Sequence, residues 1–333
     1  MKEFIKKHLP RPLFYVARGI VDNVRSLHAY NHDRSRFMRY YTFGGKSDDT
    51  INNEAHIIFH THQIEKGLSH ADFRDGFGRD ALVKLRNSLS KIDDHESTAY
   101  VAALSAIKAY INIHDERGYD LSEQRNILGR DIVEEALACE SDISGYNIMR
   151  KSSKKDNKSK NFKELFNNRF TVREFSDEPV DVEKIYEAVE LSTKTPTVCN
   201  RQSFRVLVIK DPQVIKQALS VQNGFRGYDY PPVLSIVLTD ARAFRGVTER
   251  NNQYIDGGSF MMSFLLGLEY VGLAACPLNT MFSIKEEKKA RKILGLEDNY
   301  NFIAYVAIGN FRDSNKVAKS FRFPADKIIV EVK

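Results

Sequence analysis

Apolar residues recur with a helical period through most of the first half of the chain. Ala81–Ile92, Ser97–Asn112 and Leu121–Cys139 carry them at three- and four-residue spacing, which predicts helices. Met1–Val24 places basic residues among apolar ones. We expect this segment to pack on the body of the protein, with contact at a membrane surface as the alternative.

The second half combines helical segments with short apolar runs. Helices are predicted at Val180–Ser192 and at Asp256–Val271. Short runs typical of buried strands occur at Phe204–Ile209, Val233–Leu238, Phe302–Ile308 and Lys327–Val332. This order of elements predicts an α+β fold. No glycine-rich dinucleotide fingerprint or P-loop follows any of these strands, so neither kind of nucleotide site is indicated.

A polar segment separates the two halves. Residues 150–160 read RKSSKKDNKSK, with nothing apolar, and we interpret them as a basic, solvated linker. The chain then divides into a mainly helical extension at 1–149 and a second domain at 161–333. A patch for nucleic acid or a membrane surface is the alternative, but no aromatic residues interleave to stack on bases.

The composition is that of a folded protein. The chain has 333 residues, of which 42% are hydrophobic and 28% charged, and this excludes global disorder. A net charge of +6 is mild and does not argue for nucleic-acid binding. No apolar run approaches the roughly 20 residues of a membrane span, and the N-terminus does not read as a signal peptide. Since Cys139, Cys199 and Cys276 match no disulfide framework, we expect a cytoplasmic protein.

The histidines are confined to the first part of the chain. All nine precede residue 115, so a hydrolase with a catalytic imidazole is not expected in the second half. His56, His60 and His62 leave a metal-dependent enzyme open as an alternative. Because the HExxH pattern is absent, we favour a polar network at these histidines and predict no metal site.

Two segments of the second half suit an anionic, planar ligand. Arg169, Thr171 and Arg173 alternate, so in an extended segment they point to the same side and offer two guanidinium groups and a hydroxyl. Thr195–Phe204 is a loop of small and polar residues directly before a predicted strand.

Two further segments add polar groups. Gln222–Pro232 is another loop before a strand, with glycines that allow tight backbone geometry. Tyr254–Gly258 opens the predicted helix at 256–271, and free N–H groups at a helix start favour electron-rich atoms.

Taken together, these segments resemble the nitroreductase family of FMN-dependent oxidoreductases. The ordered motifs are R-x-T-x-R-x-F, P-T-x-x-N-x-Q, a D-G pair, G-L-x-x-C and a basic C-terminal stretch, over about Phe162–Val332. The resemblance implies a mixed or antiparallel sheet flanked by helices. It also implies a homodimer with FMN at the subunit interface and NAD(P)H as the electron donor.

The resemblance also implies a set of FMN-contacting positions. Around the phosphate, the ribityl chain and the pyrimidine edge these are Arg169, Phe170, Thr171 and Arg173. The loop that meets the FMN of the other subunit comprises Pro196, Thr197, Val198, Asn200 and Gln202. The polar edge of the ring would meet Asn223 and Arg226, and flavin N5 would meet backbone N–H groups of Asp256 and Gly257. Beside the ring lie Cys276, Pro277 and Leu278, and the phosphate is clamped by Lys319 and Arg322.

The loop departs from the family pattern in ways that leave FMN binding expected and the substrate open. Thr197-Val198 stands where the family often has two serines, and Ser203-Phe204 where Pro-Trp is frequent. Flavin N5 carries the hydride, so no protein nucleophile is required, which is consistent with a second half that lacks histidine.

We therefore expect an FMN-dependent oxidoreductase in which NAD(P)H reduces the flavin and a small-molecule substrate is processed next. A flavin-binding protein without turnover, in a biosynthetic assembly, and a flavin-dependent dehydrogenase are the alternatives. The helical extension resembles those of proteins encoded with polysaccharide-biosynthesis enzymes, which suggests a glycan-related substrate. His60–Ser69 is the most distinctive stretch of the extension, and one hypothesis is that it covers the flavin pocket and selects the substrate.

Overall fold

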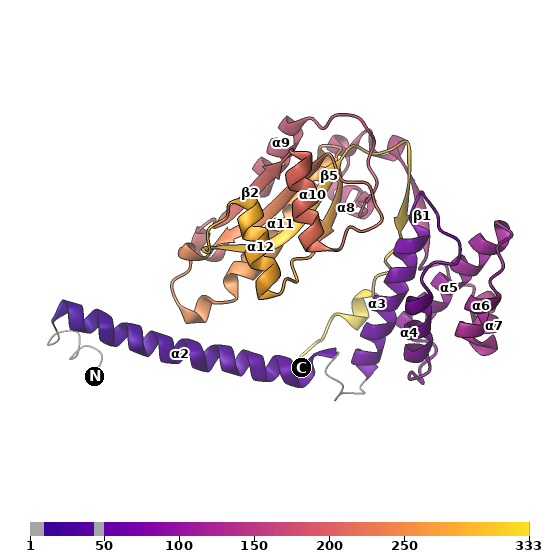
Figure 1. Cartoon of the computed structure of the whole chain (residues 1–333), viewed down its shortest axis with the longest axis horizontal. Helices are drawn as coiled ribbons and strands as arrows, with labels where there is room; N and C mark the ends of the chain where they lie inside the picture. Colours follow the sequence, from indigo (N-terminus) through magenta and orange to yellow (C-terminus); the bar gives the residue numbers. More distant parts are fainter. Residues whose placement is uncertain (1–9, 43–49, 333) are drawn as a thin grey trace.

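The computed structural model describes residues 10–42 and 50–332, and its N-terminal part is helical (Figure 1). The helices of this part are α2 (Arg11–Tyr40), α3 (Thr50–Leu68), α4 (Arg79–Leu89), α5 (Thr98–Glu116), α6 (Ser122–Leu128) and α7 (Arg130–Ala138). The predicted helices at 81–92 and 97–112 are confirmed. The one predicted at 121–139 is two helices, because Gly129 adopts a φ of 82° between them.

Helix α2 runs below the C-terminal part in Figure 1, and its N-terminal end reaches beyond it. Its contact with the C-terminal part includes the Arg250 guanidinium, whose Nε lies 2.7 Å from the Asp33 carboxylate. Leu13, Val16 and Ile20 are 57%, 61% and 61% exposed, so the prediction that Met1–Val24 packs on the body is wrong for these three side chains, whereas Gly19, Asp22 and Asn23 line a pocket together with Phe244 and Arg250. Residues 1–9 of that segment lie outside the described residues. No helix in the described part of the chain is long and apolar enough to cross a membrane.

The other N-terminal helices share one hydrophobic core. Ile64 of α3, Leu82 and Leu85 of α4, and Ile107 and Tyr110 of α5 are fully buried within it. The Ser97 hydroxyl accepts a hydrogen bond from the Tyr100 backbone N–H and caps α5. The core therefore holds α3 firmly at the side of the molecule that faces the C-terminal part.

A four-stranded antiparallel sheet forms the centre of the C-terminal part. Its order is β2 (Phe204–Ile209), β3 (Val233–Asp240), β5 (Tyr300–Gly309) and β4 (Ala274–Leu278). Strands β2, β3 and β5 confirm three of the four strands that were predicted from the apolar runs. The strand predicted at Lys327–Val332 is wrong, because that segment holds a short 3-10 turn at Ala325–Lys327 and then exposed side chains.

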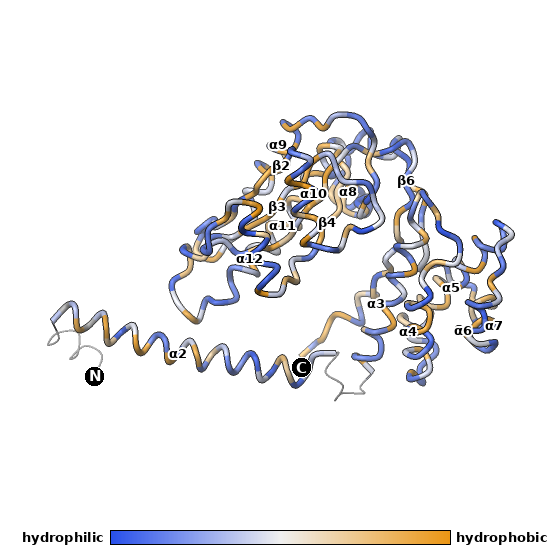
Figure 2. The backbone as a smooth tube through the Cα atoms, in the orientation of Figure 1, coloured by the Kyte–Doolittle hydropathy of each residue, from blue (hydrophilic) through white to orange (hydrophobic). Residues whose placement is uncertain are grey.

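Helices cover both faces of this sheet, which explains why β3 is buried along its whole length. Val233 and Val237 pack with α9 (Val182–Ser192) and α11 (Asn252–Tyr270), and Leu234 and Ile236 pack with the helices on the other face. Those helices are α10 (Pro212–Gln222) and α12 (Ile284–Leu294). Figure 2 shows the hydrophobic residues gathered around these strands.

A small second sheet joins the two parts of the chain. Strand β1 (Tyr146–Arg150) pairs antiparallel with β6 (Ser314–Ala318), so the end of the helical part lies beside the C-terminal segment. Helix α8 (Phe162–Asn168) follows residues 150–160. Within the predicted linker, Lys154 and Asn157 are buried, so the expectation of a fully solvated segment is wrong at these two residues. The division of domains at 150–160 stays a prediction.

Candidate functional site

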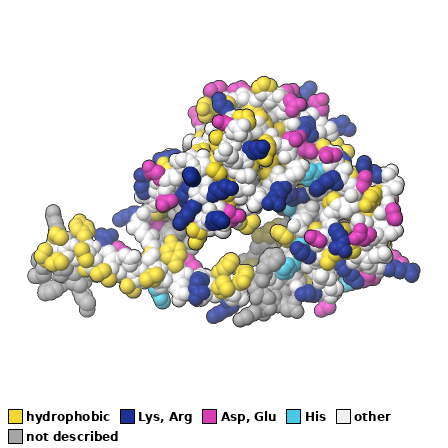
Figure 3. All heavy atoms as spheres, in the orientation of Figure 1, with side chains coloured by type: hydrophobic (Ala, Val, Ile, Leu, Met, Phe, Trp, Pro, Cys, Tyr) yellow, Lys and Arg dark blue, Asp and Glu magenta, His cyan; other side chains and the backbone are white. Residues whose placement is uncertain are grey.

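A cleft lies between α3 and the edge of the four-stranded sheet. Two neighbouring cavities of ≈ 370 and ≈ 630 Å³ form it, and both are lined by Ile58, His62, Arg173 and Pro277. Figure 3 shows Lys, Arg and His side chains along the hollow between the two parts of the molecule. The predicted site residues that line the cleft are Thr171, Arg173, Cys276, Pro277, Leu278 and Arg322.

The edge strand explains how motifs far apart in sequence meet here. The Val172 backbone N–H donates to the Ala275 carbonyl at 3.0 Å, so the segment around Arg173 runs along β4. Val172 is buried, and its neighbours Thr171 and Arg173 face the cleft. The predicted shared direction of these two residues is therefore confirmed, and Pro277 of β4 lies directly beside them.

Arg169 lies nearby but does not line either cavity. Burial lowers the pKa of its guanidinium, Glu269 opposes this shift, and the positive charge of Arg322 adds to it. The two arginines are thus close enough to repel one another. The ring of the adjacent Phe170 has the Lys154 ammonium 5.6 Å from its centre.

Helix α3 supplies the opposite wall of the cleft. Ala55, Ile58, Phe59, His62 and Lys66 line it at helical spacing, with Gln63 beside them. These positions were not among the predicted cofactor-binding residues. The sequence did mark His60–Ser69 as distinctive, and the hypothesis that this stretch covers the pocket fits the position of the helix.

A buried carboxylate fastens this wall. Glu65 accepts hydrogen bonds from the Ser144 hydroxyl at 2.8 Å, the Gly145 N–H at 3.3 Å and the Ser320 N–H at 3.0 Å. Its other oxygen lies 3.0 Å from Nδ1 of His62. Because its oxygens are occupied in this way, Glu65 is not the acidic partner of the cations in the cleft.

The predicted loop residues do not line the cleft of their own chain. Pro196, Thr197, Val198, Asn200 and Gln202 lie in the connection between α9 and β2. Residues 199, 200 and 202 have positive φ angles, so the loop is tightly turned. Its contacts with the rest of the chain include a 3.2 Å hydrogen bond from the Val198 N–H to the Asp256 carboxylate.

Asp256 and Gly257 are in the interior of α11, which begins at Asn252. The prediction that they open this helix is wrong, because the helical spacing of apolar residues does not mark the polar first turn. Asp256 is buried, and a Cβ on Gly257 would lie 2.5 Å from Ile303. Neither residue is among those that line the cleft.

Two other predicted groups are engaged elsewhere. The exposed Arg226 guanidinium donates to the Asn223 side-chain oxygen at 2.6 Å, and neither residue lines the cleft. The Lys319 ammonium donates to the Asp142 carbonyl at 2.7 Å. It lines a different cavity from Arg322, with which the sequence grouped it.

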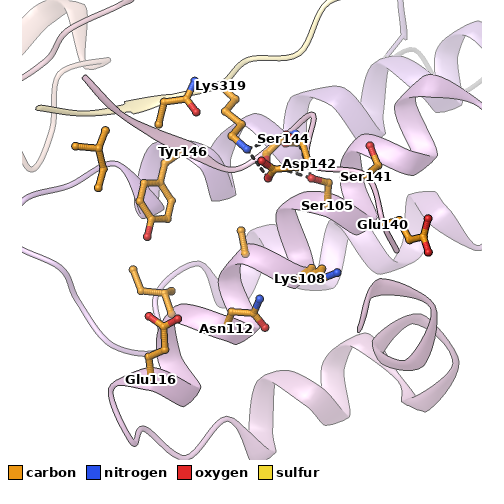
Figure 4. Close-up of a pocket in the computed structure, with 14 residues that line it drawn as sticks. Ser105, Lys108, Asn112, Glu116, Glu140, Ser141, Asp142, Ser144, Tyr146 and Lys319 are labelled. Carbon is orange, nitrogen blue, oxygen red and sulfur yellow. Dashed lines mark hydrogen bonds and ion pairs between the residues drawn. The ribbon is translucent and has the colours of Figure 1, made fainter. Parts of the chain in front are cut away.

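Lys319 belongs to a separate polar cavity of ≈ 600 Å³ beside α5, shown in Figure 4. Its basic groups are already bound, because Lys319 meets Asp142 and the Lys108 ammonium donates to the Cys139 carbonyl at 2.6 Å. The Ser105 hydroxyl is likewise paired with the Ser144 backbone. This cavity thus offers no unpaired cation comparable to those in the cleft.

Residues 167–224 match the model of the nitroreductase family. This nitroreductase-like segment contains the first cleft motif and the loop, so the resemblance predicted from the sequence is confirmed. No curated protein matches the chain.

Several solved structures are similar to about half of the chain. A putative nitroreductase in complex with FMN from Desulfovibrio desulfuricans is 23% identical, with coverage of 52% of this chain and 98% of that one and a TM-score of 0.43. A nitroreductase family protein from Clostridium difficile 630 is 22% identical, with coverage of 51% and 98% and a TM-score of 0.42. An FMN-dependent nitroreductase from Clostridium difficile R20291 is 16% identical, with coverage of 44% and 85% and a TM-score of 0.38.

The histidines ahead of the nitroreductase-like segment make hydrogen bonds. Nδ1 of His60 lies 3.0 Å from the Gln63 amide oxygen, and Nδ1 of His62 lies 3.0 Å from Glu65. Across residues 10–42 and 50–332, no group of three or more His, Cys, Asp or Glu side chains could hold a metal ion. The metal-dependent alternative at His56, His60 and His62 therefore gains no support.

Proposed function

We propose that this protein is an FMN-dependent oxidoreductase whose flavin binds in the cleft between α3 and β4. The observation that carries the proposal is the convergence of Thr171, Arg173, Pro277 and Arg322 on one cleft. They come from three separate segments, and the first of these lies within the stretch that matches the nitroreductase model.

One end of the cleft suits a phosphate. Arg322 and Thr171 line the smaller cavity. Arg169 is close enough to Arg322 for the charge of Arg322 to lower the pKa of Arg169. Among the described residues, Arg322 has no acidic partner, since its hydrogen bonds go to the carbonyls of Ser320 and Phe321. Charge-assisted hydrogen bonds contribute about 1.5–3 kcal/mol each, so Arg322, Arg169 and the hydroxyl can hold a phosphate of roughly two negative charges.

The other end suits a flat, largely apolar ring with a polar rim. Ile58, Pro277 and Leu278 supply the apolar surface, and Arg173 lies between the two cavities. When bound, FMN supplies hydride transfer at its N5 atom. The part of the protein is to bind and orient the ring, and Arg173 would stabilise negative charge at its pyrimidine edge.

The proposed turnover alternates between two partners at one cleft. NAD(P)H would reduce the bound FMN and leave, and a small-molecule substrate would then take its place and accept hydride or electrons. A glycan-related substrate stays a prediction from the helical extension. A cytoplasmic location likewise stays a prediction, which rests on the cysteine pattern.

We further propose that the protein acts as a homodimer with two flavins at its interface. The loop that carries Pro196, Asn200 and Gln202 does not line the cleft of its own chain, and Asn200 and Gln202 are exposed. This position supports its assignment to the flavin of a second copy. Gel filtration with light scattering tests the dimer directly.

The visible spectrum of the purified protein tests the proposed function. We expect a yellow protein that bleaches when NADH or NADPH is added without oxygen. Replacing Arg169 and Arg173 together by alanine should release the flavin, whereas Arg130→Ala, at an exposed position on α7, should not. A protein that stays colourless after FMN is added would overturn the proposal.

The same titration separates the alternatives. Bound FMN that neither nicotinamide reduces would identify a flavin-binding protein without turnover. FMN reduced by an organic substrate, and not by NAD(P)H, would identify a dehydrogenase. Colour retained in the double variant would show that the flavin phosphate is held elsewhere.

A further inference from the structure

We propose that Lys66, on helix α3 of the N-terminal part, is a second cation beside Arg173 at the polar edge of the flavin ring. The helical part is then a component of the cofactor site and helps to set the reduction potential of the flavin. This inference rests on the proposed function. The experiment below distinguishes a failure of the inference from a failure of the proposed function.

The position of Lys66 follows from the two faces of α3. One face carries Ile57, Ile64 and Leu68, which are fully buried in the helical core. The opposite face carries His62 and Lys66, which line the cleft. The core therefore fixes the rotation of the helix and directs the lysine stem toward the cavity.

The backbone at Lys66 is held from two directions. Its carbonyl accepts hydrogen bonds from the Ser69 hydroxyl at 2.9 Å and from the Tyr228 hydroxyl at 3.4 Å. Tyr228 also stacks on His70, with ring centres 3.9 Å apart and planes within 8°. Because Tyr228 belongs to the loop before β3, these contacts hold the end of α3 against the C-terminal part.

The positive charges of Lys66 and Arg173 in the cleft favour the binding of an anion. Within the described part of the chain, neither the Lys66 ammonium nor the Arg173 guanidinium has a hydrogen-bond or ion-pair partner. Burial lowers the pKa of Lys66, and the positive charge of Arg173 lowers it further. Two cations that repel each other at a half-buried site bind an anionic group tightly. The anion offsets the repulsion between the cations and replaces the water that burial has removed from them.

The pyrimidine edge of a reduced flavin is such an anionic group. The oxidised ring is neutral, so a cation at this edge favours the reduced form and raises the reduction potential. The sequence assigned this edge to Arg173 and Arg226, but Arg226 is exposed and bonded to Asn223. Lys66 is a cation that lines the same cavity as Arg173.

The experiment measures the midpoint potential of the bound flavin by spectroscopic titration against a reference dye. We expect Lys66→Gln to make the potential more negative, with the preference for reduced over oxidised flavin falling about tenfold or more. Lys66→Arg keeps the positive charge and should restore most of the wild-type midpoint potential. Lys285→Gln, at an exposed lysine on α12, is the matched control and should leave the potential unchanged.

Each outcome decides the proposal. If Lys66→Gln binds FMN with an unchanged potential, Lys66 is not at the ring edge and the proposal is overturned, even where the KM of the second substrate rises. Lys66→Met, which keeps the apolar stem, replaces the glutamine variant if that one does not fold. A wild-type protein without flavin overturns the proposed function itself, whereas bound flavin with an unaltered potential overturns this inference alone.

Discussion

The buried Glu65 carboxylate accepts a 3.0 Å hydrogen bond from the backbone N–H of Ser320, which follows 255 residues later in the chain. The same oxygen accepts from Ser144 and Gly145, which directly precede β1, the strand that pairs with β6. Ser320 has a φ of 49°, an unusual angle for a residue other than glycine, and the bond to Glu65 helps to hold it. One carboxylate thus joins both walls of the cleft.

We predict that Glu65→Ala lowers the free energy of unfolding by about 3 kcal/mol, since several buried donors lose their acceptor together. Glu65→Gln should cost less, because an amide oxygen can still accept from Ser320. Urea denaturation followed by circular dichroism measures both. Glu140→Ala, at an exposed position near the same strand, is the control and should change stability by less than about 0.5 kcal/mol. An equally small change for Glu65→Ala would show that this network carries little stability.

The buried ion pair of Lys154 and Glu269 supports a second prediction. The ammonium lies 2.7 Å from the carboxylate, and both side chains are 3% exposed. Burial lowers the pKa of Lys154 and raises that of Glu269. Lys154→Met alone should therefore cost about 3–5 kcal/mol, since it leaves a buried carboxylate without its cation.

The double variant Lys154→Met with Glu269→Met should be considerably more stable than either single variant, because it removes both buried charges. A double-mutant cycle in urea measures this coupling. If the two single changes simply add, the pair is not an energetic unit. The exposed pair of Arg130 and Glu134 is the control and should show coupling of at most about 0.5 kcal/mol.

The sequence predicts strands where an apolar run packs beneath helices, and it fails where pairing with another strand decides the outcome. Val233–Leu238 is buried along its whole length, and Phe204–Ile209 is partly buried, because helices cover both faces of the sheet. Lys327–Val332 has the same β-branched character, yet it pairs with no strand in the described part of the chain. Strand β4 was missed, because Ala274–Leu278 is short and contains alanines and a proline.

In the candidate site too, local sequence predicts some positions, whereas others depend on packing between distant segments. The R-x-T-x-R motif is local, so the position of Arg173 could be predicted from its spacing. Lys66 could not, since its place beside Arg173 depends on the packing of α3 against the C-terminal part. Lys154 was expected in water for the same reason: its partner, Glu269, is 115 residues away.

The close approach of α9 and α11 supports a prediction on glycine. A Cβ on Gly267 would lie 2.8 Å from the Ala188 carbonyl oxygen, a backbone atom that cannot move aside cheaply. Gly267→Ala should therefore destabilise the protein by about 1–3 kcal/mol. Gly258→Ala on the same helix meets nothing within 4 Å and should stabilise it by up to about 1 kcal/mol. Thermal unfolding of the two variants compares them, and equal melting temperatures would show that α9 and α11 can separate freely.

The stacked pair of His70 and Tyr228 makes stability depend on pH. Burial, followed by the nearby positive charges of Arg74, Lys66 and Arg173, lowers the pKa of His70 from 6.5 to about 4, and Asp72 opposes this only weakly. The unfolded chain therefore takes up a proton below pH 6.5 that the folded chain refuses until about pH 4. Stability from this residue is present at neutral pH and is lost as the pH falls through that window.

His70→Phe keeps the ring against Tyr228 and removes the titration, so we expect its melting temperature to fall less than that of the wild type between pH 6.5 and 4. Burial also lowers the pKa of His60, which contributes to acid sensitivity in both proteins, so the difference between them isolates His70. His28→Phe, at an exposed position on α2, should follow the wild-type curve. Parallel curves for His70→Phe and the wild type would mean that His70 is as easily protonated in the folded protein as in the unfolded chain.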